Sequence, residues 1–549
     1  MNSTSIRSKL RLLAAGLAVL ALPRTLDAHE SGEHERDDGQ RLATGQRITP
    51  LAIPGAKQQP LNPKLPGYPD FVAGMAVRSR LSPDGNTLAV LCAGHNSLVA
   101  PNPPAVDAAN STQYIFLYDV SGAHRGDPQL TQVIKQTNSH VGLVFSPDGS
   151  RLYATGGRDD AVYAYAKSGG SWAQTAKVDL KHGASGGLGL FGVSPNASGI
   201  GISSDGKTLV VANNYNDSIS VIDTGSATVR YEHDLRQFFP GNEGKSGGVG
   251  GTFPLGVVVK RNETAYVSSD RDREVVVVDI SSPAGGKLIK RIALDGNGQG
   301  MTLDASGSRL YVAQDNADQV AVIDTSTNAI IAKIDARGPA ELLRGAGDDD
   351  DQKGWGRGRD DDDDDQGRGR HRNGGARYTG AATFAVTLSP DGKTLYAVNS
   401  GANSIAVIPL HGDHANRVAG LIPTAYDPHD ITLSADGRWM YIVNGKSVTG
   451  PNTGYLAGNT SVMTHAYPGG PGVGPAASAA AFTKNQYQFQ LERGSLVSAP
   501  VPGREQLDRL TWQVAENNFY GAEHEHDREL MEALRKRIKH VIYVVKENR

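Results

Sequence analysis

One pattern of hydrophobic and polar positions recurs along the chain. An apolar residue precedes a turn of the Ser-Pro-Asp-Gly type, and an alternating apolar strand, a polar turn and a second strand follow. The clear copies of the turn lie at 81–85, 145–149, 202–206, 388–392 and 433–437, and degenerate copies lie at 259–263 and 303–307. The pattern therefore predicts seven units of short antiparallel strands.

Each part of the unit has a structural reason. The Asp-Gly pair supplies the positive φ that a tight hairpin needs. Alternation and β-branching, as in Thr208–Ala212 and Ser218–Asp223, are typical of paired, half-buried strands. A unit of ~40–50 residues is the propeller period, and Asp391 and Asp436 are 45 residues apart. We therefore expect an all-β fold, a seven-bladed β-propeller with four strands in each blade.

Several of these strands resemble those of a known family. Leu310–Ala313 with Val320–Thr325, and Leu395–Asn399 with Ile405–Ile408, closely resemble YVTN-repeat propellers of the YncE-like type. The resemblance covers most of residues 70–502 and implies a ring of WD40-like architecture. It says little about function, because propellers include enzymes, binding proteins and scaffolds.

Two segments interrupt the ring. Residues 341–378 combine Asp348–Asp351 and Asp360–Asp365 with Gly-Arg pairs, and lack the ligand spacing of a calcium loop. We expect a disordered insertion between the fifth and sixth blades. In the last blade, a Gly/Pro-rich stretch precedes candidate strands at Tyr487–Leu491 and Ser495–Ser498, and we place a ring-closing strand near Gln46–Ile53.

Composition and charge narrow the picture. The 66 glycines and few aromatic residues suit many short strands and tight turns. The net charge of −3, without a basic stripe, excludes nucleic acid as an expected partner. Cys92 is the only cysteine, so no intrachain disulfide can form, and its apolar neighbours indicate a small buried side chain.

The N-terminus has the pattern of a signal peptide over residues 1–28. Arg7, Lys9 and Arg11 precede the apolar run Leu12–Leu22, and Leu26–Ala28 forms a small-residue cleavage site. An uncleaved membrane anchor is the alternative, but the apolar run is short for a span. We expect a periplasmic or secreted protein with no stable membrane span after cleavage, and a linker over residues 29–69.

Beyond residue 502 the pattern becomes helical. Residues 505–518 and 528–540 read as two helices, so 503–538 is a helical linker, and Val541–Val545 reads as a buried strand. A carboxylate and an amide, Glu547 and Asn548, follow at its carboxyl end, where α/β sheets collect metal and ligand groups. Residues 539–549 are thus the expected first strand of an α/β domain.

The stretches Leu507–Asn518 and Arg537–Arg549 together resemble the junction of proteins that join a YncE-like propeller to an alkaline-phosphatase-superfamily phosphoesterase. The resemblance implies that Glu547 and Asn548 match early metal ligands, and that a divalent metal is the cofactor of the full-length parent. The family's other ligands and its nucleophile are not in this sequence. We expect the chain to be truncated at that domain, catalytically incomplete and without a stably bound metal.

Histidines give three weaker candidates. The tracts His29–Glu35 and Glu523–Asp527 mix His with acids, and we favour solvated linkers over metal sites there. His140 and His429 lie near the entry of two innermost strands, at repeat positions one residue apart. This offset argues against a ligand ring and favours polar residues of the channel.

Three functions remain open. The chain is the exported propeller module of a metal-dependent phosphoesterase, or a binding propeller of the cell envelope, or a lactonase-like propeller with acids or His at the channel mouth. No catalytic residue is assigned from the sequence. The expected ligand is a small molecule, a glycan or a protein on one propeller face.

Overall fold

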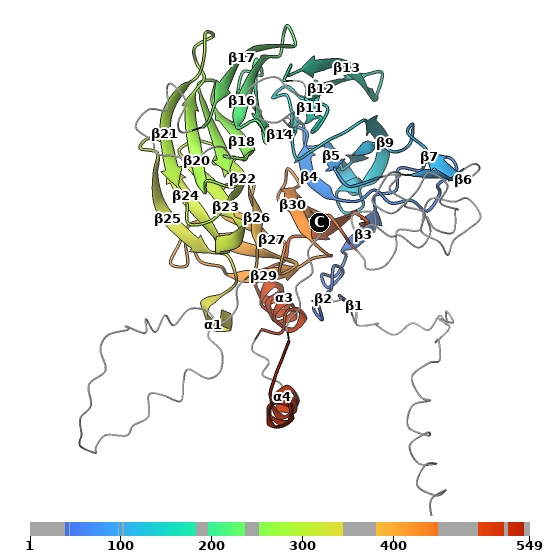
Figure 1. Ribbon diagram of the computed structural model, residues 1–549, viewed down its shortest axis with the longest axis vertical. Helices are drawn as coiled ribbons and strands as arrows, with labels where there is room; N and C mark the ends of the chain where they lie inside the picture. The colour runs from blue at the N-terminus through green and yellow to red at the C-terminus, as the bar shows by residue number, and fades with distance from the viewer. Residues whose placement is uncertain are drawn as a thin grey trace, which may run out of the picture. The chain divides into compact units, whose positions relative to one another are not determined.

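The computed structural model describes residues 39–42, 44–96, 98–101, 104–182, 196–236, 252–343, 380–447, 492–520 and 525–542. Within these residues, seven antiparallel sheets of four strands follow one another in chain order around a ring (Figure 1). The molecule is a seven-bladed β-propeller, as the repeat predicts.

The first three blades are consecutive in the chain. Blade 1 comprises β4 (Ala76–Leu81), β5 (Thr87–Cys92), β8 (Gln113–Asp119) and β9 (Gln129–Gln136). Blade 2 comprises β10 (Leu143–Phe145), β11 (Arg151–Thr155), β12 (Ala161–Ser168) and β13 (Ser171–Asp179). Blade 3 comprises β14 (Ala197–Ile202), β15 (Thr208–Asn213), β16 (Ser218–Asp223) and β17 (Thr228–Asp234).

The other blades follow the same order. Blade 4 comprises β18 (Pro254–Lys260), β19 (Thr264–Ser269), β20 (Glu274–Asp279) and β21 (Lys287–Ala293). Blade 5 comprises β22 (Gly298–Leu303), β23 (Arg309–Gln314), β24 (Gln319–Asp324) and β25 (Ala329–Asp335). Blade 6 comprises β26 (Thr383–Leu388), β27 (Thr394–Asn399), β28 (Ser404–Pro409) and β29 (Gly420–Pro423). Blade 7 comprises β30 (Pro428–Leu433), β31 (Trp439–Asn444), β32 (Ser495–Pro500) and β3 (Lys57–Pro60).

The first strand of each blade is the innermost one. These strands contact one another in the cyclic order β4, β10, β14, β18, β22, β26, β30 and back to β4. The second and third strands are almost fully buried because neighbouring blades cover both of their faces, as in Thr208–Asn213. The outermost strands alternate between exposed and half-buried residues, as in Thr228–Asp234. The core is therefore divided into layers between the blades.

The Ser-Pro-Asp-Gly turns join the first and second strands of the blades. In blade 1, Ser82 Oγ donates to Asp84 Oδ1 (2.5 Å), and the Gly85 N–H donates to the Ser82 carbonyl (2.8 Å). The degenerate copies at 259–263 and 303–307 occupy the same place in blades 4 and 5. The loops between second and third strands and those between blades lie at the opposite ends of the strands, on what we call the mouth face.

Glycine allows the innermost strands of blades 2 to 5 to approach one another. A Cβ at Gly199 would lie 2.1 Å from the carbonyl oxygen of Leu255 in the next blade, and Gly142 and Gly256 face the same kind of collision. Because the colliding atom is backbone, it cannot move aside without shifting a strand. This position therefore favours glycine wherever two innermost strands meet so closely.

Blades 1 and 7 replace this glycine by charged residues. Asp430 Oδ2 accepts from the backbone N–H of Ser79 (3.0 Å) and pairs with Arg80 Nη1 (2.9 Å). Arg78 lies 3.6 Å from the same carboxylate oxygen and donates through Nε to the Val141 carbonyl (3.0 Å). Ion pairs and hydrogen bonds thus link the first and last blades.

The ring closes through a strand from the N-terminal part of the chain. The prediction of a closing strand near Gln46–Ile53 is wrong, because β3 at Lys57–Pro60 pairs with β32, while Arg47–Ile48 (β2) pairs with Gln40–Arg41 (β1). The sequence Lys-Gln-Gln-Pro carries no hydrophobic alternation, since an outermost strand has only one partner and faces solvent. The error follows from that missing pattern.

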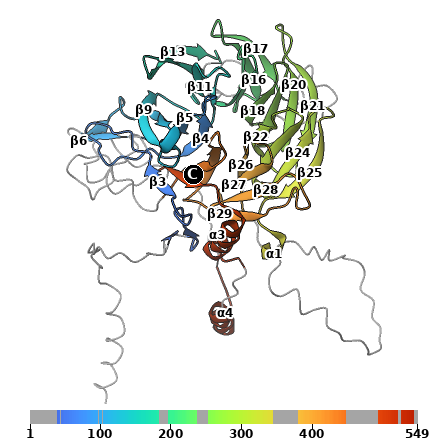
Figure 2. The same cartoon turned by 180° about the vertical axis from the view of Figure 1, so that it is seen from behind.

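The predicted helices are present with shifted bounds. The helix α3 (Arg504–Asn517) packs on β29 through Leu507, Leu510 and Val514, and the two lie side by side in Figures 1 and 2. Thr511 Oγ1 accepts from the N–H of Leu421 in that strand (2.9 Å). The helix α4 spans Glu525–Arg537.

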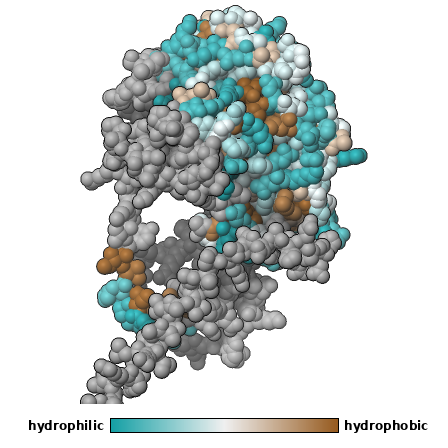
Figure 3. Space-filling view, turned by 90° about the vertical axis from the view of Figure 1, so that its right-hand side faces the viewer, coloured by the Kyte–Doolittle hydropathy of each residue, from teal (hydrophilic) through white to brown (hydrophobic). Residues whose placement is uncertain are grey.

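Smaller elements complete the described chain. They are β6 (Val99–Pro101), β7 (Pro104–Val106), the 3-10 helices Gly122–Arg125 and Asp315–Ala317, and α1 (Ala340–Leu343). Val541 and Ile542, the described part of the predicted buried strand, lie in no strand and are 83% and 88% exposed. A strand forms only by pairing with another strand, and these two residues pair with none in the described chain. The face in Figure 3 is largely hydrophilic, with separate hydrophobic patches.

Several predictions fall outside the described residues. These are the signal peptide, most of the insertion (344–379, between β25 and β26) and the strand Tyr487–Leu491. None of the helices in the described ranges is long and apolar enough to span a bilayer.

Candidate functional site

The mouth face is built on a repeated backbone link between blades. In five blades the residue just before the innermost strand has a positive φ; these strand-entry residues are Met75, Asn196, Phe253, Ala382 and Asp427. The N–H of Asp427 donates to Asn403 Oδ1 of blade 6 (2.8 Å), and its carbonyl accepts from the Gly445 N–H (2.7 Å). Because both backbone groups are bonded, the backbone at Asp427 is held in place.

The Asp427 carboxylate collects three partners from blades 6 and 7. Ser400 Oγ donates to Oδ1 at 2.7 Å, and His429 Nε2 lies 3.3 Å from the same oxygen. Lys446 Nζ lies 3.2 Å from Oδ2. A hydroxyl, an imidazole and an ammonium thus converge on one carboxylate.

Burial makes this cluster electrostatically strong. The side chains of His429 and Asp427 are only 9% and 18% exposed. Burial alone opposes ionisation of Asp427, but His429, Lys446 and Ser400 outweigh it and hold the pKa of this carboxyl well below its usual range. Asp427 is therefore a fixed negative charge that holds His429 and Lys446 in place.

The His429 ring is held on two sides. Its centroid lies 4.8 Å from that of Phe384, and a Cβ at Gly445 would lie 3.3 Å from Nε2. Its other nitrogen, Nδ1, is buried and has no hydrogen-bond partner among the described residues. Since buried polar atoms are nearly always paired, this nitrogen is a natural contact for a bound ligand.

Glu492 supplies a second, different carboxyl group. It is 6% exposed, and Gly74, which has no side chain, packs against its Cβ. Burial raises its pKa to about 7, an effect that nearby Lys446 opposes and the charge of Asp427 reinforces. One carboxyl here is always ionised and the other exchanges a proton near neutral pH. We call Asp427, His429, Lys446 and Glu492 the channel-mouth site.

Apolar residues of blades 1, 2 and 4 meet inside the ring. Val77 and Val141 belong to the hydrophobic cluster of blades 1 and 2, and Leu255 of blade 4 packs against the same cluster. Since blade 4 is not a neighbour of blade 1 or blade 2 in the ring, the Leu255 contact crosses the channel. Part of the interior of the ring is therefore apolar.

His140 and His429, the two histidines singled out in the sequence, lie in different surroundings. His140, before blade 2, accepts or shares a hydrogen bond with Ser198 Oγ at 2.9 Å. Burial, with a smaller contribution from Arg78, lowers its pKa to about 4, so the ring is neutral at pH 7. His429 belongs to the channel-mouth site on blade 7. The two histidines therefore have different hydrogen-bond partners in different blades.

Sequence reasoning found only one of the four site residues. Asp427 and Lys446 flank the two first strands of blade 7, while Glu492 follows a long excursion of the chain. A signal for Asp427 did exist: it occupies the strand-entry position at which other blades carry Met75, Phe253 or Ala382. Comparing the repeats position by position would have shown this departure.

The metal ligands implied by the resemblance, Glu547 and Asn548, lie outside the described residues, as does the tract His29–Glu35. The side chains of the tract Glu523–Asp527 are not described either. Across the described ranges, no group of three or more His, Cys, Asp or Glu residues is arranged to hold a metal. Cys92 is buried in β5, and burial raises the pKa of its thiol, as expected of a small core residue.

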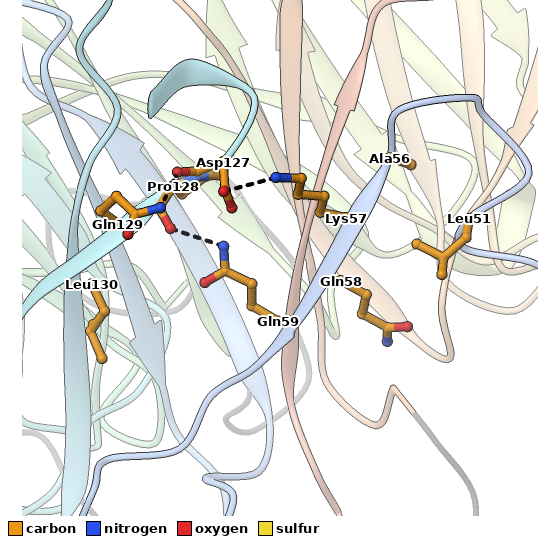
Figure 4. Close-up of a pocket in the computed structure, with 9 residues that line it drawn as sticks. All are labelled: Leu51, Ala56, Lys57, Gln58, Gln59, Asp127, Pro128, Gln129 and Leu130. Carbon is orange, nitrogen blue, oxygen red and sulfur yellow. Dashed lines mark hydrogen bonds and ion pairs between the residues drawn. The ribbon is translucent and has the colours of Figure 1, made fainter. Parts of the chain in front are cut away.

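An open groove of about 650 Å³ lies where the ring closes (Figure 4). It runs between β3 and the chain leading into β9, and its lining residues include Leu51, Gln58 and Leu130. Lys57 Nζ pairs with Asp127 Oδ2 (2.8 Å), and Gln59 Nε2 donates to the Pro128 carbonyl (2.9 Å). The ammonium of Lys57 and the amide of Gln59 are thus already paired within the groove and are not available to a ligand. We therefore place the candidate site at the channel mouth.

Comparison with known proteins bears on the same segment. Residues 371–450 match the family model described as Lactonase, 7-bladed beta-propeller. The matched residues include blade 6 and the first two strands of blade 7, and with them Asp427, His429 and Lys446. A search of the curated proteins finds no match.

Several solved structures are similar in fold. Hydrazine synthase of Kuenenia stuttgartiensis is 17% identical with a TM-score of 0.46, over 68% of this chain and 93% of that one. A putative 6-phosphogluconolactonase of Bacteroides fragilis NCTC 9343 is 14% identical (TM-score 0.44; 66% and 89%). Another, of Bacteroides uniformis ATCC 8492, is 15% identical (TM-score 0.44; 65% and 89%). At these identities the likeness concerns the fold alone.

Proposed function

We propose that the channel-mouth site binds a lactone and opens it by hydrolysis. The observation that carries the proposal is the convergence of His429 and Lys446 on Asp427, beside the buried Glu492. The lactonase family model matches the segment that contains three of these residues. This function corresponds to the third hypothesis from the sequence.

The reaction assigns one role to each group. Glu492, with a pKa near neutrality, removes a proton from water as the water oxygen attacks the lactone carbonyl carbon. Lys446 and His429 stabilise the negative charge that develops on the carbonyl oxygen. The ring C–O bond then breaks, and the departing oxygen takes the proton from Glu492. The product is a hydroxy acid, and Asp427 acts only by positioning Lys446 and His429.

Hydrolysis of glucono-δ-lactone and of γ-butyrolactone, followed in a pH-stat at pH 7, tests this proposal. We expect turnover above the buffer rate, and a loss of about 10²-fold or more in kcat for Glu492→Gln and for Lys446→Met. Glu505→Gln on the exposed first turn of α3 is the matched control and should leave kcat unchanged. A Glu492→Gln variant as active as the native chain would contradict the proposal. Binding without turnover would favour a binding propeller of the cell envelope.

We also propose that the chain is exported and that its parent is a metal-dependent phosphoesterase. The signal-peptide pattern of residues 1–28 and the junction-like pattern at Arg537–Arg549 support this. N-terminal sequencing of the secreted protein should begin at His29. The 549-residue chain should not hydrolyse p-nitrophenyl phosphate with added Mn²⁺ or Zn²⁺; turnover abolished by a chelator and by Glu547→Gln would show a complete phosphoesterase site instead.

A further inference from the structure

A second feature of the mouth face is a stack of three side chains between blades 3 and 4. The Phe253 and Tyr215 rings meet edge to face, with centroids 5.4 Å apart and planes at 79°. The Arg271 guanidinium lies over the Phe253 ring, 4.1 Å from its centroid. Each side chain comes from a different loop: Tyr215 follows β15, Phe253 precedes β18, and Arg271 follows β19. We call these three residues the aromatic platform.

Two hydrogen bonds hold the backbone of Phe253, the central residue of the platform. The Phe253 N–H donates to Asp217 Oδ1 (3.0 Å), and its carbonyl accepts from the Asp270 N–H (3.0 Å). Phe253 is a strand-entry residue, the position that carries Asp427 in blade 7. The same backbone link that aims a carboxylate in blade 7 therefore aims an aromatic ring in blade 4.

The platform is open to solvent. Tyr215 is 47% exposed, and its hydroxyl makes no hydrogen bond in the part of the chain that the structure describes. Tyr provides a large contact area at low cost in conformational entropy, and both Tyr and Arg are enriched where partners bind tightly. A tyrosine that is held in place and yet uncovered is thus ready to stack on a flat ligand.

Groups of both charges surround the platform. Asp270 and Asp272 flank Arg271 in the same loop. Gln299 Nε2 donates to Asp270 Oδ1 (2.7 Å) and to Asp315 Oδ2 (3.2 Å), which fixes two carboxylates near the mouth. An anionic ligand would meet these carboxylates, and a cationic one would meet Arg271. A neutral ligand with many hydroxyls can accept from the guanidinium and donate to the carboxylates.

From these contacts we propose that the aromatic platform is a binding site for a neutral oligosaccharide. One sugar ring stacks on Tyr215, and its hydroxyls bond to Arg271 and to the carboxylates of Asp270 and Asp272. The site lies on blades 3 and 4, apart from the channel-mouth residues of blade 7. It goes beyond the proposed hydrolysis and does not depend on it.

Calorimetric titration of the full chain with cellohexaose, chitohexaose and maltohexaose tests the inference. At least one sugar should bind, and Tyr215→Ala should weaken that binding tenfold or more. Tyr215→Phe keeps the ring and should change affinity less than threefold. Ile331→Ala removes an equally exposed side chain on the outermost strand of blade 5 and should have no effect.

The lactone assay on the same variants separates the two proposals, since Tyr215→Ala should retain native kcat. Native thermal unfolding of Tyr215→Ala would show that the variant is folded. Failure of all three sugars to bind, or unchanged affinity in folded Tyr215→Ala, would overturn the oligosaccharide site and leave the hydrolysis proposal untouched.

Discussion

Asp430 in blade 7 forms an ion pair with Arg80 in blade 1, with Oδ2 and Nη1 2.9 Å apart. The carboxylate is almost fully buried and also accepts from the Ser79 N–H, while buried Arg78 lies close by. One side chain thus joins the innermost strands at the point where the ring closes.

Removing this carboxylate should destabilise the whole ring. Asp430→Ala leaves Arg78 buried without its counter-charge, and we expect a loss of about 3–5 kcal/mol in unfolding free energy. Urea denaturation followed by circular dichroism measures the loss. Arg509→Ala breaks the exposed pair with Glu505 and should cost less than about 1 kcal/mol. Equal effects of the two variants would refute the special role of Asp430.

Adding one methyl group at Gly199 should also be costly. Its Cβ would lie 2.1 Å from the Leu255 carbonyl oxygen, so an innermost strand must shift. We expect Gly199→Ala to lose about 1–3 kcal/mol, the usual range for overpacking. At Gly338 the nearest atom is a Leu421 methyl at 3.4 Å, so Gly338→Ala should stay within about 0.5 kcal/mol in the same denaturation assay.

Stability should fall as the pH rises from about 6.5 to about 9. His182 is buried between Asp160 and Glu232, with Nδ1 2.6 Å from Asp160 Oδ1 and Nε2 3.2 Å from Glu232 Oε1. Burial lowers the pKa of this imidazole, but the two carboxylates outweigh burial and raise it to about 9. Because the folded state holds the proton more tightly, this stabilisation is complete below pH 6.5 and lost above 9.

The difference of about 2.5 pKa units corresponds to about 3 kcal/mol. Chemical denaturation at a series of pH values should show a decline of this order in the native chain. His182→Gln should flatten the profile between pH 6.5 and 9. A decline that persists unchanged in His182→Gln would assign it to another group.

The lactone reaction should depend on ionised Glu492. Since its pKa is about 7, kcat/KM should rise with pH and reach half its maximum near pH 7. Asp427 remains ionised throughout this range and should not contribute to the profile. A pH-stat series on the native chain measures the curve. A flat profile between pH 5.5 and 8.5 would exclude Glu492 as the base.

The turns made the fold predictable, whereas the outermost strands did not. The Asp-Gly pairs at Asp84 and Asp148 mark local hairpins, and the buried second and third strands are short apolar runs rich in β-branched residues, as in Glu274–Asp279. The closing strand Lys57–Pro60 has no such pattern, because backbone pairing with a distant strand determines it.

The channel-mouth site was less accessible to sequence reasoning for a related reason. Ser400, Asp427, Lys446 and Glu492 come from separate loops, and the ring brings them together without any fixed spacing. Only His429 was singled out, from its place at the entry of an innermost strand. The proton affinity of Glu492 depends on burial by distant segments, which a local pattern does not contain.

Because β3 pairs with β32, blade 7 is the last blade that the chain can complete. Residues 57–60 are synthesised before the strands of blades 1 to 6, yet their partner at 495–498 is synthesised only after them. Pairing of strands this distant in sequence is slow, because the entropy of closing the long loop must be overcome first. Since His429 and Lys446 belong to the blade completed by this pairing, partly made or internally cleaved chains should lack an ordered site. Any activity at the mouth would then report that the ring has closed.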